Sequence, residues 1–281
     1  MLNPYKVTEP TVISFSGGRS SGYMLSKVLE AHDGILPDDC KIIFANTGKE
    51  MPQTLDFVRD VQENWNIDII WLERFMRIGG EEENKYMYET KVVDYETASR
   101  NGEPFASLAN RPYLPNPIAR FCTVELKIKA IRDYLWNTDF PKDFTAFIGI
   151  RGDEERRAAK MHGTKEQNQD RWLPMYLDGV TKEMVGDFWR SMPFDLKLPN
   201  NNGTTDWGNC DLCFLKGAKK RMSIIKERPD LATWWIEMED KVGATFRKDE
   251  MSYKDMLKAS QEQPDMFEND PDLSISCFCG D

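Results

Sequence analysis

The sequence has few histidines and no excess of basic residues. Only 2 of its 281 residues are histidine, and the formal net charge is −10 with an isoelectric point near 5.0. Such a chain lacks the broad basic surface by which proteins coat nucleic acids or anionic membranes. The composition therefore argues against those two classes of protein, while it leaves room for a local basic groove.

Long apolar runs are missing as well. No run approaches the ~20 residues of a transmembrane helix, and the N-terminus lacks the basic-then-apolar arrangement of a signal peptide. We therefore expect a cytoplasmic protein with no membrane partner. In a reducing compartment, the 6 cysteines are expected as thiols or metal ligands and not as disulfides.

The sequence does contain an alternation of apolar strands and amphipathic helices. Strands are predicted at 12–15, 41–46, 67–72 and 144–150, and helices at 20–31, 51–61, 123–135 and 181–190. Strands that alternate with helices predict an α/β fold with a parallel sheet, covered on both faces, in which ligands gather at the carboxyl ends of the strands.

Two changes of composition suggest how the chain is organised. From about 75 to 118, glycines, prolines and an acidic run replace the periodic pattern, which predicts a lid-like insertion. An Asn- and Thr-rich loop near 200 predicts a boundary between a first domain, 1–200, and a smaller Cys-containing C-terminal region, 201–281.

The first predicted strand leads through a Ser- and Gly-rich loop into a helix. The N–H groups at a helix start have no intrahelical partners, and glycines let the backbone approach an anion closely, so this loop suits a phosphate. A turn whose serines only cap the helix is the alternative. The candidate anion-binding residues are Ser16, Gly17, Gly18, Arg19, Ser20 and Ser21.

Basic residues follow the fourth predicted strand. Arg151 leaves that strand at the ligand edge, and Arg157 comes six positions later in an acidic stretch. Guanidinium groups here would close over phosphate or sulfate from the side opposite the loop. Ion pairs with the neighbouring carboxylates on a solvated helix are the alternative.

Several motifs, in order, resemble the phosphoadenylyl-sulfate (PAPS) reductase family of the PP-loop ATP pyrophosphatases, the adenine nucleotide alpha-hydrolase group. They are Ser16-Gly-Gly-x-x-Ser21, Asn46-Thr-Gly48-x-Glu50-x-Pro52, Cys122-x-x-x-Leu126-Lys127 and Gly149-Ile-Arg151-x-Asp153-Glu154. The resemblance implies a Rossmann-like domain that binds the adenylyl part of ATP, PAPS or adenylyl sulfate (APS). It places Asn46, Thr47 and Gly48 near the adenine and ribose, and it gives Ser21, Lys127 and Arg151 catalytic roles.

Two departures from the family pattern bear on the reaction. Ser20 stands where many PP-loop enzymes carry an aspartate, which removes one contact to magnesium, and the tail lacks the Glu-Cys-Gly-Leu-His segment of the sulfate reductases. The tail favours ATP-dependent activation with sulfur transfer, with a nucleic acid as one acceptor, over reduction of PAPS or APS to sulfite. A nucleotide- or nucleic-acid-binding module that has lost turnover is the third hypothesis.

The cysteines predict a metal site. In the family, a cysteine at the Cys122 position joins a Cys-x-x-Cys pair on a [4Fe–4S] cluster, which implies Cys122, Cys210 and Cys213 with either Cys277 or Cys279 as ligands. A structural zinc would be held by Cys210, Cys213, Cys277 and Cys279 alone. Unliganded thiols are the third alternative.

A basic stretch follows the Cys-x-x-Cys pair and has tryptophans near it. Lysines and arginines from 216 to 228, with Trp207, Trp234 and Trp235, would seat a nucleic acid through phosphate contacts and base stacking. A solvated helix face with core tryptophans is the alternative. A sulfur- or electron-donor protein is a further expected partner.

Overall fold

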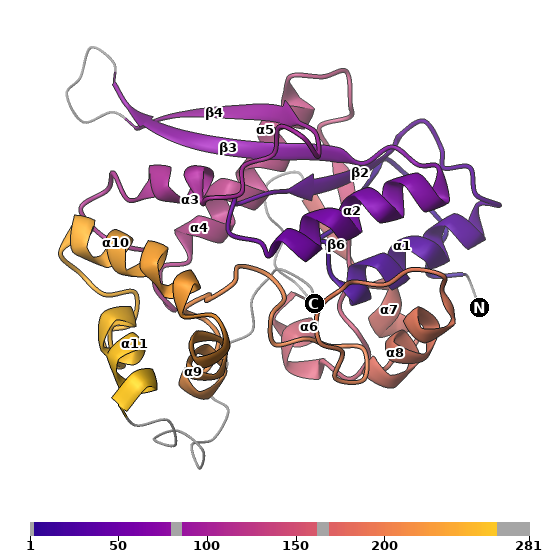
Figure 1. Ribbon diagram of the computed structural model, residues 1–281. Coiled ribbons are helices and arrows are strands. Elements are labelled where there is room, and N and C mark those ends of the chain that lie inside the picture. Colours follow the sequence, from indigo (N-terminus) through magenta and orange to yellow (C-terminus); the bar gives the residue numbers. More distant parts are fainter. Residues whose placement is uncertain (1–2, 80–85, 162–168, 263–281) are drawn as a thin grey trace.

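A computed structural model describes residues 3–79, 86–161 and 169–262, which form an α/β protein around a 6-stranded sheet (Figure 1). The strand order is β4-β3-β2-β1-β5-β6, and every neighbouring pair is parallel except β3 with β4. The predicted fold class is therefore confirmed. The strands are β1 (Thr11–Ser14), β2 (Cys40–Ala45), β3 (Ile70–Ile78), β4 (Tyr86–Val93), β5 (Phe144–Ile148) and β6 (Gln169–Trp172).

Helices cover both faces of the sheet and form a separate group at one end of it (Figure 1). None of those in the described part of the chain has the length and apolar character that a membrane crossing requires. The helices of the sheet region are α1 (Arg19–Ala31), α2 (Pro52–Trp65), α3 (Glu103–Leu108), α4 (Phe121–Thr123), α5 (Lys129–Trp136), α6 (Glu155–Met161), α7 (Pro174–Leu177) and α8 (Lys182–Ser191). The C-terminal helices are α9 (Ala218–Glu227), α10 (Ala232–Val242) and α11 (Tyr253–Glu262), with a short 3-10 turn at Pro229–Leu231.

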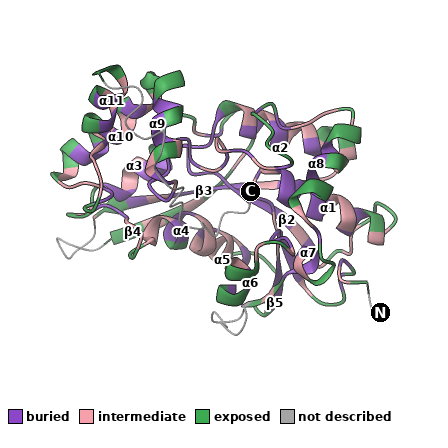
Figure 2. Cartoon of the chain, turned by 90° about the horizontal axis from the view of Figure 1, so that it is seen from below, coloured by how far each residue is buried: buried purple, intermediate pink, exposed green. Residues whose placement is uncertain are grey.

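The apolar strands are buried because each of their faces meets a different helical layer. Ile13 and Phe44 pack in the apolar cluster shared with α1, α2 and α8, whereas Val12 and Ile43 pack with Leu135 of α5. Successive side chains of a strand point to opposite faces, so an uninterrupted apolar run needs a cover on both sides. Figure 2 shows β2 and β3 as a buried centre between helices whose outer faces are exposed.

The region from 75 to 118 differs from the predicted lid-like insertion. β3 continues to Ile78, and the chain returns as the antiparallel strand β4, with Trp71 opposite Val93 and Ile78 opposite Tyr86. α3 follows and packs against β3. β4 is mostly exposed at the edge of the sheet, so it lacks the apolar pattern that predicted the central strands.

The C-terminal helices have an apolar cluster of their own, to which α3 also contributes. Trp235 and Phe246 are fully buried in it. A buried ion pair between Lys49 Nζ and Asp211 Oδ2, 2.8 Å apart, joins this cluster to the loop before α2. The division predicted near residue 200 stays a prediction. α3, which belongs to the first predicted domain, packs with helices of the second.

We expect Trp189→Ala to lower the free energy of unfolding by about 3–5 kcal/mol, as for other buried aromatic truncations. Trp189 is buried against Phe57, Trp65 and Phe194, and its Nε1 donates to the Arg19 carbonyl at 2.8 Å. Urea denaturation measures the change. Trp172→Ala is the control because Trp172 is 41% exposed; similar losses for both variants would contradict the packing described.

Candidate functional site

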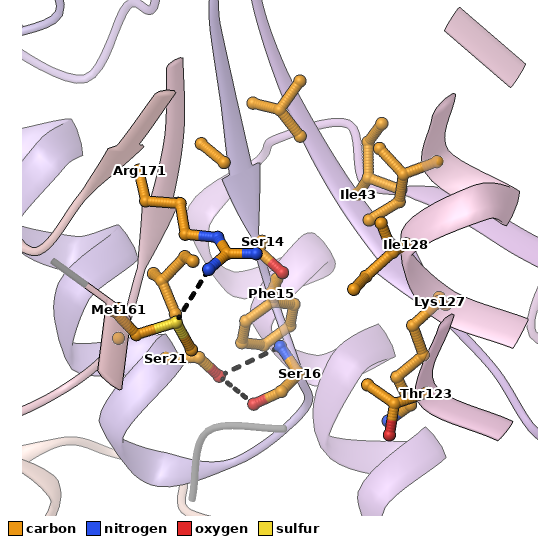
Figure 3. Close-up of a pocket in the computed structure, with 16 residues that line it drawn as sticks. Ser14, Phe15, Ser16, Ser21, Ile43, Thr123, Lys127, Ile128, Met161 and Arg171 are labelled. Atoms are coloured by element: carbon orange, nitrogen blue, oxygen red, sulfur yellow. Dashed lines mark hydrogen bonds between the residues drawn. The ribbon is translucent and has the colours of Figure 1, made fainter. Parts of the chain in front are cut away.

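A cavity opens at the carboxyl end of β1, between the sheet and the helix that precedes β5 (Figure 3). Its base is apolar, with Val12, Ile43 and Ala146 from three neighbouring strands. Two basic side chains, Lys127 and Arg171, lie on opposite sides of it in Figure 3. None of the described residues that line it is acidic. An apolar base with cationic walls suits a flat ring that carries an anionic group.

The Ser- and Gly-rich loop holds its shape through its own hydroxyl groups. The Ser16 amide and hydroxyl both donate to Ser21 Oγ, at 3.2 and 3.0 Å, and Ser21 Oγ donates to the Gly18 carbonyl at 2.9 Å. Gly17 has a φ of +76°, and a Cβ there would lie 2.7 Å from Thr54 Cγ2, so a side chain is excluded. Ser16 and Ser21 line the cavity, while Gly17 and Gly18 line a smaller hollow on the α2 side.

Arg19 does not face the cavity, which corrects its predicted role at the anion. Its guanidinium pairs with the Asp195 carboxylate, Nε to Oδ1 at 2.7 Å and the terminal nitrogen to Oδ2 at 3.0 Å, and it also donates to the carbonyls of Leu196 and Leu198. Such a bidentate pair fixes both partners. Arg19 therefore ties the loop to the segment after α8, and the sequence could not show this because Asp195 lies 176 positions away.

Arg151 and Ser20 meet at the end of β5. An Arg151 terminal nitrogen donates to Ser20 Oγ at 3.1 Å, and Arg151 Nε donates to Asp153 at 2.8 Å. Arg157 pairs with Glu154 instead, which agrees with the alternative of local ion pairs. The loop and the end of β5 approach so closely that a Cβ on Gly149 would lie 3.1 Å from the Ser21 Cα. Arg151 is thus beside the loop, and Arg157 is held within its own helix.

A π-helical turn, Val124–Ile128, delivers Lys127 to the cavity. The predicted helix begins at Phe121 and not at 123, and Thr123 lines the cavity together with Lys127. Lys127 Nζ lies 3.6 Å from Glu50 Oε1. π-turns are rare and frequent at functional sites; this one places two polar side chains of one helix on one cavity.

The Asn46-Thr-Gly48 segment does not line the cavity, and its place near adenine and ribose stays a prediction. Asn46 Nδ2 donates to Glu73 at 2.6 Å, and both the Thr47 amide and its hydroxyl donate to Glu50, at 2.9 and 2.8 Å. Gly48 donates to Asn46 Oδ1 at 3.0 Å. These groups instead shape the turn that contacts the C-terminal helices.

The three described candidate cysteine ligands share one apolar cluster. Cys210 and Cys213 are buried in it and Cys122 is half-buried against it. Burial raises the pKa of the Cys210 thiol, and the charges of Glu50 and Cys213 act in the same direction. Across 3–79, 86–161 and 169–262, no three His, Cys, Asp or Glu side chains gather into a group that could hold a metal.

The described cysteines therefore do not make a metal site by themselves. Cys277 and Cys279 lie outside the described residues. The iron–sulfur and zinc hypotheses both stay predictions, because each of them needs at least one of these two residues.

Two residues of the site were missed from the sequence. Arg171 lies on the short strand β6, in a polar stretch with no periodic pattern, and donates to Met161 Sδ at 3.6 Å. Glu50 appears in the sequence only as a member of the second motif, just before a predicted helix, but it is buried between Thr47, Lys127 and Cys210.

The basic cluster after the Cys-x-x-Cys pair is mostly committed to internal contacts. Arg221 is fully buried and pairs with Glu250, Trp235 is fully buried, and Lys220 pairs with Asp206 at 2.9 Å. Trp235 thus fits the alternative of a core tryptophan, and a nucleic-acid seat at this stretch stays a prediction.

Comparisons with known proteins agree with the motif assignment. A model of the phosphoadenosine phosphosulfate reductase domain matches residues 10–177, which include the loop and the cavity. An uncharacterized nin region protein of Escherichia phage lambda is 30% identical over 210 residues, which are 74% of this chain and 67% of that protein. An uncharacterized protein of Methanocaldococcus jannaschii is 28% identical over 156 residues, which are 55% of this chain and 26% of that protein's length.

One solved structure is also similar. The U34-tRNA thiolase NcsA from Methanococcus maripaludis, with its [4Fe-4S] cluster, has a TM-score of 0.40 at 13% identity, and the match covers 99% of this chain and 81% of that one.

We expect protein purified without oxygen to contain about four irons per chain, and Cys213→Ser to lose most of them. Cys40→Ser, at a buried thiol outside the predicted ligand set, is the control and should keep its iron. Elemental analysis with the visible absorbance measures both. One zinc and no visible absorbance would instead support the zinc set, and the absence of both metals would contradict both hypotheses.

Proposed function

Since the chain belongs to the phosphoadenosine phosphosulfate reductase domain family, we propose that the cavity at the carboxyl edge of its sheet binds an adenine nucleotide. The observation that carries this proposal is the apolar base, with Val12 and Ile43, set between Lys127 and Arg171. The adenine would pack on the apolar base, and the phosphates would lie toward Ser16 at the loop. The amides at the start of α1 add a favourable dipole there.

The Ser20–Arg151 contact defines how charge would be balanced at the loop. The Arg151 guanidinium donates to Ser20, the residue that stands where many PP-loop enzymes carry an aspartate. We infer that Arg151 and Lys127 stabilise the negative charge of the departing group, and that any magnesium is held by the phosphates of the nucleotide and not by residue 20. Fixed cations in a dry site stabilise such charge strongly.

The proposed reaction is ATP-dependent activation of an acceptor followed by sulfur transfer. An acceptor oxygen attacks the α-phosphorus of ATP, the bond to the β-phosphate oxygen breaks, and pyrophosphate leaves. Hydrosulfide then attacks the activated carbon, a carbon–sulfur bond forms, the carbon–oxygen bond breaks and AMP leaves. Ser21 keeps the loop in the shape that receives pyrophosphate. An iron–sulfur cluster bound by the cysteines would supply sulfur or electron chemistry, and no step is assigned to it.

Reduction of PAPS or APS is the second candidate, and the acid-free lining favours it. A sulfated nucleotide needs no metal, so its oxyanions would be matched by Lys127 and Arg171 alone. A cysteine thiolate would attack sulfur, the sulfur–oxygen bond would break, and the nucleotide would leave. A second thiol would then release sulfite and leave a disulfide.

We expect Lys127→Met to weaken ATP binding about tenfold, because hydrogen bonds to charged groups contribute about 1.5–3 kcal/mol. Lys129→Met is the matched control, since Lys129 lies two positions along the same helix and pairs with Glu125 at 2.8 Å, away from the cavity. Calorimetry measures both. No heat from the unmodified protein with ATP, PAPS or APS would refute the proposed site.

We expect pyrophosphate to be released from ATP when bulk RNA or DNA is added as acceptor, and no sulfite to be released from PAPS with a thiol reductant. The first reaction cleaves at the α-phosphorus, whereas the second needs a thiol at the sulfuryl group. Pyrophosphate and sulfite assays on one anaerobic preparation separate them. Catalytic sulfite release would reverse the order of the two candidates, and nucleotide binding without either product would support a module without turnover.

A further inference from the structure

One segment of this acidic chain is basic. Residues 110–138, which run from the end of α3 to the turn after α5, carry five basic and two acidic side chains, a net charge of +3, in a chain with a net charge of −10. The basic residues are Arg111, Arg120, Lys127, Lys129 and Arg132. A positive segment in a negative protein marks a place where a polyanion could approach.

Three aromatic rings in or beside this segment each have an arginine guanidinium next to the ring. The Arg132 guanidinium lies 4.8 Å from the centre of the Trp136 ring, and the Arg111 guanidinium lies 5.0 Å from Tyr86 and 5.9 Å from Tyr113. These rings remain 45%, 37% and 47% exposed. A ring that is held by a guanidinium and is still open to solvent is a ready surface for base stacking.

A groove of about 340 Å³ runs between β4 and the end of α5. Tyr88 and Thr90 form one wall, and Tyr134 and Trp136 form the other. The acidic side chain in the groove, Asp133, is neutralised by Arg74, whose terminal nitrogen lies 2.5 Å from it. The groove is thus aromatic and nearly free of uncompensated negative charge.

We propose that this face, formed by β4 and residues 110–138, binds single-stranded nucleic acid. This inference rests on the proposed function, in which the face would hold the acceptor. Stacking on Trp136 and Tyr113 requires unpaired bases, which excludes a continuous duplex. The same helical segment carries Thr123 and Lys127 into the cavity, so a strand on its outer surface lies beside the nucleotide site.

Fluorescence anisotropy with labelled oligothymidylate and oligouridylate tests this proposal. We expect both single strands to bind more tightly than a duplex, with a slope of log K against log salt near −2, as for about three neutralised phosphates. Trp136→Ala should weaken binding about tenfold, as the loss of one base stack does, and Tyr113→Ala is a second, independent variant. Tighter binding of oligouridylate would indicate RNA, and tighter binding of oligothymidylate would indicate DNA.

Trp172→Ala is the matched control, because Trp172 is as exposed as Trp136 and lies on β6, at the other edge of the sheet. An ATP titration of the same samples separates this inference from the proposed function, since Trp136 does not line the cavity. ATP binding without binding of either single strand would overturn the nucleic-acid face alone. Equal losses in Trp136→Ala and Trp172→Ala, or tighter binding of the duplex, would overturn it as well.

Discussion

The buried ion pair between Lys49 and Asp211 is the contact on which the relation between the sheet and the C-terminal helices depends. Both side chains are buried, and each has a further partner: Lys49 lies over the Trp234 ring at 4.8 Å, and Asp211 accepts from Trp235 Nε1 at 2.7 Å. A buried charge is tolerated only when it is paired and hydrogen-bonded. Because Asp211 follows Cys210 directly, this network also sets the position of the Cys-x-x-Cys turn.

The turn before α2 therefore contacts a different part of the molecule from the loop after β1. Thr47 and Glu50 are directed at the cysteine side, where Thr47 Oγ1 lies 3.4 Å from Cys210 Sγ. The Ser16 loop is directed at the cavity. Lys127 touches both, since it lines the cavity and lies 3.6 Å from Glu50. One lysine thus lies between the cavity and the thiol side of the molecule.

The fold decides which basic residues reach the cavity. Arg19, Arg157 and Arg221 are each held by a carboxylate away from it, and Arg151 pairs with Asp153 while it also donates to Ser20. Lys127 and Arg171 reach the cavity because a π-turn and an edge strand place them there. The overall negative charge therefore says little about the local field at either proposed binding surface.

The sequence alone determined the parallel sheet, the Ser- and Gly-rich loop before a helix, and the family, because apolar strands, amphipathic helices and contiguous motifs are local signals. The tertiary structure decided the pairing of Arg19 with Asp195, the turn of Asn46 away from the cavity and the position of Arg171 at the cavity. It also decided that β4 would form the exposed edge beside residues 110–138. These features join residues far apart in the chain, and no local pattern records such partners. Burial and ion pairing are fixed only when the whole chain has packed.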